Sequence, residues 1–181
     1  RPQPLTKSKL MLNLDPNTPP TSAISQVQTW IKNQKFIITQ TNSTIPWGAY
    51  YLISDSCQDH FLSSFFPNLN LQSQSSITLS LKFLLVAPNS RLSWQFHHYR
   101  QEYWYVITGP VDISLSLSDI QPPSQTYQPN SNIQIPKGTR HRLIGTQTWG
   151  LVAEIWQHTD INHPSTESDI IRLQDDYQRQ D

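Results

Sequence analysis

The sequence predicts an all-β domain, and two features of its pattern support this fold class. From residue 79 onward, short apolar runs alternate with turn residues, among them Pro88, Gly109 and Gly138. Residues 111–117 (Val-Asp-Ile-Ser-Leu-Ser-Leu) alternate strictly between apolar and polar side chains, as a half-buried strand must. Many short strands with regularly spaced turns are typical of a sandwich or barrel, and a jelly roll is the version that encloses a ligand cavity. We therefore expect a single jelly-roll barrel with a short N-terminal helical appendage.

The N-terminal part is expected to differ from the rest. Residues 1–44 should form an arm and a short helix that packs on the barrel, and residues 45–181 the barrel itself. Thr21 or Ser22 can cap this helix. Its apolar stripe consists of Ile24, Val27, Trp30 and Ile31.

Four further apolar stretches predict strands, namely residues 36–39, 49–53, 77–86 and 151–156. The last is more uniformly apolar than the others, with Glu154 as its one charged residue, so we expect it at the centre of a sheet. Residues 55–76 form an insertion with clustered apolar side chains, including Phe61, Phe65 and Phe66. The simpler interpretation is a loop or short helix held on the barrel by its aromatic rings. A lid over the mouth of the pocket is the alternative.

Composition excludes several classes of protein. The formal net charge of the 181 residues is 0, so no electrostatic field favours nucleic acid or an anionic membrane. Five glycines and their spacing exclude a glycine-rich phosphate loop or a dinucleotide-binding fingerprint. Cys57 is the only cysteine, which fits a reducing compartment. No apolar run approaches the roughly 18 residues of a membrane-spanning helix, and we expect a cytoplasmic protein.

The densest group of chemically active side chains lies between residues 95 and 102. Side chains alternate faces along a strand, so Gln95 and His97 should share one face. A turn after His97 would lead into a second strand that begins near Glu102. Together these residues offer an amide oxygen, an imidazole nitrogen and a carboxylate oxygen, a mixed set that suits zinc or a similar divalent transition ion.

A fourth ligand is expected from His141, which follows a turn marked by Pro136 and Gly138. Protein ligands that leave one position open are typical of a catalytic metal site, whereas structural zinc sites are usually closed by cysteines. The sequence therefore predicts a catalytic divalent metal ion, with zinc as the expected ion, held by Gln95, His97, Glu102 and His141.

The spacing of these residues resembles that of a known family. Residues 92–104 read Leu-Ser-Trp-Gln-Phe-His-His-Tyr-Arg-Gln-Glu-Tyr-Trp and match the pattern Leu-Ser-x-Gln-x-His-His-x-Arg-x-Glu-x-Trp. This pattern is that of the C-terminal isomerase domain of type II mannose-6-phosphate isomerases, which are members of the cupin superfamily. Further matches in the same order are residues 46–50, 141–143 and 169–172. A second insertion, near residues 159–168, precedes the last of these matches.

The resemblance implies a cupin barrel over residues 45–181 and an activity. The activity would be a metal-dependent isomerisation between an aldose phosphate and a ketose phosphate of the mannose-6-phosphate and fructose-6-phosphate type, through an enediolate. The expected catalytic residues are Arg100, which the resemblance implies, Lys82 and Arg172, which match family positions, and Glu154, which is a candidate base. The expected substrate-binding residues are Lys137 and Arg142 as phosphate candidates, Trp47 and Trp104 as core or cavity wall, and His98, which could face the substrate, replace Gln95 as a ligand or lie only in the turn. The general base stays open among Glu154, His98 and Asp175, and Trp94, Trp149 and Trp156 are expected to serve packing.

Two alternatives to an isomerase remain. One is a cupin that binds a sugar phosphate without turnover. The other is a metal-dependent cupin oxygenase, which the glutamine in the ligand set disfavours. In each case the expected partner is a small molecule rather than nucleic acid or a membrane, and a homodimer is a further expectation because cupins often pair through their outer strands.

Overall fold

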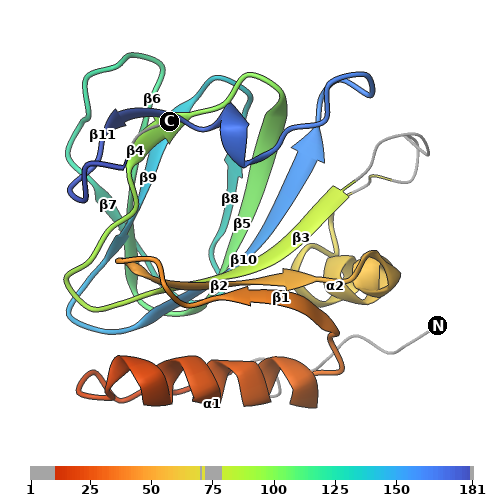
Figure 1. Cartoon of the computed structure of the whole chain (residues 1–181), viewed down its shortest axis with the longest axis vertical. Coiled ribbons are helices and arrows are strands. Elements are labelled where there is room, and N and C mark those ends of the chain that lie inside the picture. The colour runs from red at the N-terminus through yellow and green to blue at the C-terminus, as the bar shows by residue number, and fades with distance from the viewer. Residues whose placement is uncertain (1–10, 70, 72–78, 180–181) are drawn as a thin grey trace.

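The computed structural model describes residues 11–69, 71 and 79–179 of the chain. Within these residues the strands form two antiparallel sheets that face each other across a common interior (Figure 1). This arrangement confirms the predicted all-β class and the jelly-roll barrel. The two α-helices of the described part of the chain lie outside the barrel, and both precede residue 66.

The larger sheet has the strand order β1-β2-β3-β10-β5-β8. Its strands span, in that order, Ile38–Asn42, Gly48–Ile53, Leu79–Val86, Gly150–His158, Arg100–Thr108 and Asn132–Ile135. The smaller sheet has the order β11-β4-β9-β6-β7. Its strands span Ile171–Gln174, Trp94–Phe96, Arg140–Gly145, Val111–Ser116 and Gln125–Tyr127.

Strand β10 is buried along its whole length, because it lies between β3 and β5 and both of its faces are covered. This central position agrees with the prediction for residues 151–156. Its inward residue Val152 packs in the barrel interior with apolar residues of both sheets, among them Val106, Ile113 and Leu143.

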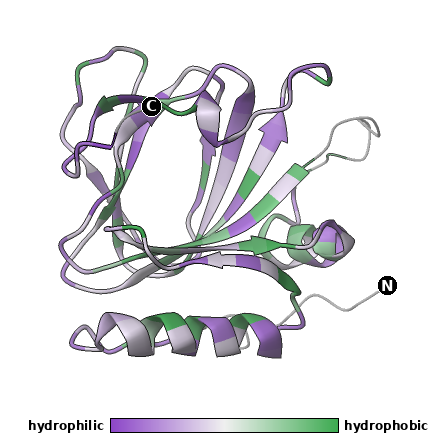
Figure 2. Cartoon of the chain, in the orientation of Figure 1, coloured by the Kyte–Doolittle hydropathy of each residue, from purple (hydrophilic) through white to green (hydrophobic). Residues whose placement is uncertain are grey.

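The outer face of the larger sheet is covered by helices α1 (Pro20–Asn33) and α2 (Gln58–Phe65). The Phe83 ring is fully buried there, with ring centroids 5.8 Å from Trp30 and 5.6 Å from Phe36. Figure 2 shows apolar and polar residues alternating around α1, as expected of a helix with one buried side. No helix within the described residues is both long enough and apolar enough to cross a membrane.

The start of α1 differs from the prediction. Neither Thr21 nor Ser22 caps the helix, because both lie inside it and Pro19 is the N-cap residue. Pro20 takes the first helical position, where its fixed φ suits the helix and its missing N–H is not needed.

The insertion after β2 begins with a 3₁₀ turn at Asp55–Cys57 and continues as α2. Phe61 and Phe65 are fully buried against the outer face of the larger sheet, so the described part of the insertion is held on the barrel by its aromatic rings. Residues 70 and 72–78 lie outside the described residues.

The turn before β2 requires glycine at position 48. Gly48 has a φ of +152°, and a Cβ atom there would lie 1.9 Å from the carbonyl oxygen of Leu85. The close approach of the two backbones at this turn sets the start of β2 against β3.

Candidate metal centre

Three buried side chains from both sheets converge inside the barrel. His97 follows β4, Glu102 lies on β5 and His141 lies on β9. The Nε2 atoms of His97 and His141 are 3.1 Å apart, and Glu102 Oε1 lies 3.1 Å from His97 Nε2. Glu102 Oε2 lies 3.5 Å from His141 Nε2. One potential ligand atom from each residue lies within 4.8 Å of the others, so this group could hold a metal ion.

The second nitrogen of each imidazole is fixed by a backbone carbonyl. His97 Nδ1 donates to Asp169 O at 3.1 Å, and His141 Nδ1 donates to Thr139 O at 2.9 Å. With the proton on Nδ1, each Nε2 presents a lone pair to the common centre. Burial also lowers the pKa of His141 to about 4, with partial compensation from Glu102, so this ring is neutral near pH 7.

Glu102 is the anionic member of the cluster. Burial opposes ionisation, but the positive charge of Arg100 and the two imidazoles together hold the pKa of Glu102 well below its usual range. Its Oε2 atom is buried and has no hydrogen-bond partner among the described residues. A buried carboxylate oxygen without a partner costs free energy unless a cation or a donor meets it.

These observations fit a divalent transition metal. Two ligand nitrogens at about 2.0–2.1 Å from a tetrahedral zinc ion are about 3.3 Å apart, close to the 3.1 Å between the two Nε2 atoms. The converging lone pairs and the unpartnered oxygen of Glu102 both call for a positive charge at their centre.

Gln95, the remaining expected ligand, lies next to the cluster. It pairs directly with His141 across β4 and β9, and with Arg172 across β4 and β11. Directly opposed residues share a face of the sheet, so all three side chains point into the barrel. Gln95 Oε1 accepts a hydrogen bond from Ser93 Oγ at 2.5 Å.

Arg100 is fully buried beside the cluster. Its Nε donates to Glu102 Oε1 at 2.8 Å, and its Nη2 lies 3.2 Å from His97 Nε2. The guanidinium carbon is 3.4 Å from the ring centroid of Trp156, a cation–π contact. The expected catalytic arginine is therefore in contact with two of the candidate metal ligands.

Lys82 and Glu154 lie opposite each other on β3 and β10 and face the interior. The Lys82 Nζ atom is 3.5 Å from the ring centroid of Trp156 and donates to Glu167 Oε1 at 2.8 Å. Glu154 accepts from the indole N–H groups of Trp104 (2.7 Å) and Trp156 (2.8 Å). Burial, reinforced by the charge of Glu102, raises the pKa of Glu154 to about 8.

The structure does not bring every expected substrate-binding residue to the cluster. Arg142 is adjacent to His141 in β9, so its side chain takes the opposite face, where Leu92 O, Gln121 and Gln174 accept from its guanidinium. Lys137 is exposed on the turn before β9.

The remaining expected site residues are spread along the barrel. Trp47 packs in the barrel interior with other apolar side chains. The Trp104 ring lies edge-on to His141, with ring centroids 5.6 Å apart. The His98 side chain is exposed, and the Asp175 carboxylate is bound to Arg179.

Four contributors to the site are not predicted by the sequence: Trp156, Ser165, Glu167 and Asp169. The sequence predicts a packing role for Trp156, yet this side chain contacts Arg100, Lys82 and Glu154. It is two residues from Glu154 on β10, so strand alternation alone could have placed both on one face. Ser165 and Glu167 lie in the second insertion, where no periodic pattern points to the site, and Asp169 begins the matched stretch 169–172, which assigns it no role.

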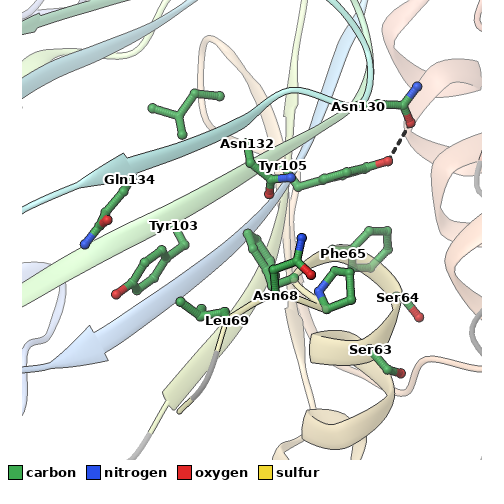
Figure 3. Close-up of a pocket in the computed structure, with 13 residues that line it drawn as sticks. Ser63, Ser64, Phe65, Asn68, Leu69, Tyr103, Tyr105, Asn130, Asn132 and Gln134 are labelled. Carbon is green, nitrogen blue, oxygen red and sulfur yellow. Dashed lines mark hydrogen bonds between the residues drawn. The ribbon is translucent and has the colours of Figure 1, made fainter.

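A groove lies away from the cluster, on the outer face of the larger sheet (Figure 3). It has a volume of about 630 Å³ and runs between the end of α2 and strands β5 and β8. Tyr103 and Tyr105 line it, whereas Glu102 and Trp104 of the same strand face the interior. The groove and the candidate metal centre therefore use opposite faces of β5.

The fold and the site together define a class of protein. Two antiparallel sheets that close a jelly-roll barrel around a His-Glu-His cluster make this chain a cupin barrel. Residues 67–175, more than half of the chain, match the model of the family described as "Mannose-6-phosphate isomerase C-terminal". The chain belongs to that family, and the matched range includes all four expected metal ligands.

Relatives with sequence similarity are larger proteins. Xanthan biosynthesis protein XanB of Xanthomonas campestris pv. campestris is 29% identical over 100 residues, which are 55% of this chain and 20% of that protein. Alginate biosynthesis protein AlgA of Pseudomonas aeruginosa is 30% identical over 102 residues, 55% of this chain and 19% of that protein. The chain thus spans about a fifth of the length of these relatives.

Among solved structures, vicilin from Corylus avellana (hazelnut) is similar with a TM-score of 0.51. The sequence identity is 15%, and the likeness covers 74% of this chain and 35% of that chain. This structural similarity supports the fold and nothing beyond it.

Proposed function

We propose that this protein is a metal-dependent aldose–ketose isomerase that acts on a sugar phosphate of the mannose-6-phosphate and fructose-6-phosphate type. The observation that carries the proposal is the buried convergence of His97, Glu102 and His141 in a chain of the mannose-6-phosphate isomerase C-terminal family. Both imidazoles present Nε2 to one centre, and a carboxylate oxygen completes the group.

These three residues, with Gln95 as the fourth ligand, would hold a divalent ion, zinc first. Bound there, the ion would supply Lewis-acid stabilisation of negative charge on the sugar oxygens. Arg100 touches both His97 and Glu102, and its guanidinium adds a fixed positive charge beside the same position.

Substrate binding would use the cations that face the interior. Lys82 and Arg172 lie on β3 and β11, on opposite sides of the barrel, and both point inward. Lys137 is exposed on the turn whose Gly138 N–H donates to His97 O at 3.1 Å, and it is the second candidate for binding the phosphate. Arg142 is bound on the other face and is not part of this proposal.

Proton transfer is assigned to Glu154. Isomerisation removes the proton on C2 of the aldose and returns a proton to C1, and a single base on one side of the sugar can perform both steps. Of the three candidate bases, Glu154 alone lies on the inner face opposite Lys82, whereas His98 is exposed and Asp175 is held by Arg179. A carboxyl group with a raised pKa is suited to gain and lose a proton near neutral pH.

The test is a coupled assay that measures the interconversion of mannose-6-phosphate and fructose-6-phosphate. It is run on the purified protein, after chelation, and after restoration with Zn²⁺ or Co²⁺. We expect turnover that chelation removes, that the metal restores, and that His97→Ala or Glu102→Gln abolishes. His163→Ala, which changes an exposed histidine, is the matched control and should keep full activity.

Three results would overturn the assignment. Turnover that persists in His97→Ala or Glu102→Gln would refute the metal centre. Tight binding of the sugar phosphate without product in the metal-loaded protein would indicate a binding protein. Metal-dependent consumption of oxygen would indicate an oxygenase.

A further inference from the structure

Asp169 binds four partners around the turn that carries His97. It is 7% exposed and lies at the end of the 3₁₀ turn Glu167–Asp169. Its carboxylate accepts from the backbone N–H groups of His98 (2.9 Å) and Tyr99 (3.0 Å). It also accepts from Ser165 Oγ at 2.6 Å. Its own backbone carbonyl accepts from His97 Nδ1 at 3.1 Å.

These contacts fix His97 in two ways. The carbonyl holds the proton on Nδ1 and sets the plane of the ring, so that Nε2 faces Glu102 and His141. The carboxylate holds the two backbone amides that directly follow His97, which keeps the carbonyl and the ring at a constant separation. Loss of the carboxylate would release both constraints together.

A second line of contacts leads from Asp169 to Arg100. Arg100 Nη1 donates to Ser165 Oγ at 2.9 Å and to Thr166 O at 3.3 Å. A serine hydroxyl has one proton, and here it points to Asp169, so its lone pairs are left for Arg100. The Ser165 backbone N–H donates to His158 Nδ1 at 2.9 Å, which anchors the segment to the end of β10.

We propose that Asp169 is a positioning residue that holds the metal ligand His97 directly and the catalytic arginine Arg100 through Ser165. The residue therefore couples the geometry of the metal centre to that of the guanidinium beside it. The role of Asp169 in holding His97 depends only on the metal site. Its role in holding Arg100 rests on the proposed isomerase function.

An asparagine cannot replace this residue. The Asp169 carboxylate accepts from three donors, two N–H groups and one hydroxyl, through two oxygens. An asparagine side chain would offer one oxygen, and its amide N–H₂ group would face at least one of these donors. Asp169→Asn therefore keeps the size of the side chain and removes the function that the geometry assigns to it.

The first test measures Co²⁺ affinity by competition with a chromophoric chelator, together with the visible d–d absorption of the bound ion. Asp169→Asn should lower the affinity by about 10- to 100-fold and alter the absorption band, as expected for loss of a group that orients a ligand. The matched control is Asp160→Asn, which removes a carboxylate that also accepts from a backbone N–H in the preceding loop. The control should stay within two-fold of wild type.

The second variant separates the two parts of the proposal. Ser165→Ala breaks the contact to Arg100 and leaves the backbone contacts of Asp169. We expect its Co²⁺ affinity to stay within two-fold of wild type, while kcat for the isomerase reaction falls at least ten-fold with little change in KM. If the protein has no isomerase activity, only this kcat measurement is lost, and the metal measurement still decides the role of Asp169.

A measurement on the wild-type protein covers the case in which Asp169→Asn does not fold. Long-range ¹H–¹⁵N correlation spectra of the metal-free protein should show His97 protonated on Nδ1. Hydrogen–deuterium exchange of the same protein should be slow at the backbone amides of His98 and Tyr99. Protonation on Nε2, or Co²⁺ affinity of a folded Asp169→Asn within two-fold of wild type, would overturn the proposal.

Discussion

The Nε2 atoms of His97 and His141 lie 3.1 Å apart, and the other nitrogen of each ring donates to a backbone carbonyl. With these tautomers both Nε2 atoms face one buried centre, where a positive charge is favourable, and Arg100 Nη2 lies 3.2 Å from His97 Nε2. The cluster could therefore hold a metal ion, and the first prediction concerns this binding.

The metal-free protein should bind one Co²⁺ or Zn²⁺ ion per chain. His141→Ala and Glu102→Gln should each weaken binding by about 100-fold or more, because each removes one of three buried ligands. Isothermal titration calorimetry measures both stoichiometry and affinity. Affinities within three-fold of wild type in both variants would show that the cluster holds no ion.

The stability of the metal-free protein should depend on the protonation of His141. Burial lowers the pKa of His141 to about 4 in the folded state, from 6.5 in the unfolded chain. The unfolded chain therefore binds the proton first, so this contribution to stability is present above pH 6.5 and is lost as the pH falls towards 4. Between pH 7 and pH 5 the loss is about 2 kcal/mol.

Urea unfolding in the presence of a chelator measures this loss. His141→Gln removes the titrating group, so the variant should lack this part of the pH dependence. Equal slopes of stability against pH in the two proteins would contradict the buried neutral imidazole.

Glu154→Gln should abolish turnover and leave Co²⁺ affinity within three-fold of wild type. The base must be ionised, and burial together with Glu102 raises the pKa of Glu154 to about 8 in the metal-free site. A bound cation lowers the pKa of Glu154. We therefore expect kcat to rise with pH in a single ionisation step whose midpoint lies at or below pH 8. Retention of wild-type kcat by the variant would exclude Glu154 as the base.

Glu167→Gln should lower KM for the sugar phosphate several-fold and change kcat less. The Glu167 carboxylate pairs with Lys82 at 2.8 Å, so an anionic substrate has to compete with it for the ammonium group. Lys82→Met is the opposite change and should raise KM. Initial-rate kinetics at fixed metal concentration give both constants, and an unchanged KM in Glu167→Gln would show that the substrate does not meet Lys82.

Phe83→Ala should destabilise the protein by about 3–5 kcal/mol without affecting the metal site. The ring is fully buried between the larger sheet and the aromatic side chains of Trp30, Phe36, Phe61 and Phe65. Leu117→Ala is the matched surface control, because Leu117 is 87% exposed, and should change stability by less than about 0.5 kcal/mol. Unfolding measurements test both, and a loss below about 1 kcal/mol in Phe83→Ala would contradict the packing of the outer core.

The sequence allowed prediction of the barrel and of the proximity of His97 and Glu102 because both depend on local rules, whereas His141 is expected beside them from the spacing of the family pattern. Alternation along a strand places Gln95 and His97 on one face, and the turn after His97 returns the chain so that Glu102 lies close by. The same rule explains why Arg142 does not reach the cluster. Adjacent residues of a strand point in opposite directions, so His141 and Arg142 cannot both face the interior.

The surroundings of the ligands could not be predicted because they depend on contacts between segments distant in the sequence. Ser165 and Asp169 lie more than 60 residues after Arg100 and His97, in and beside a loop without periodic pattern. Trp156 is a different case, because a uniformly buried strand hides which of its faces is functional. Its two cation–π contacts, to Lys82 and Arg100, are set by strand register rather than by composition.

The ligands of the cluster are divided between the two sheets, since Glu102 belongs to the larger and His141 to the smaller. An ion bound by both residues would cross-link the two sheets of the barrel. In cells depleted of transition metals, the two sheets should therefore separate more often near the candidate metal centre. Proteases should then degrade the protein faster than in cells with sufficient metal.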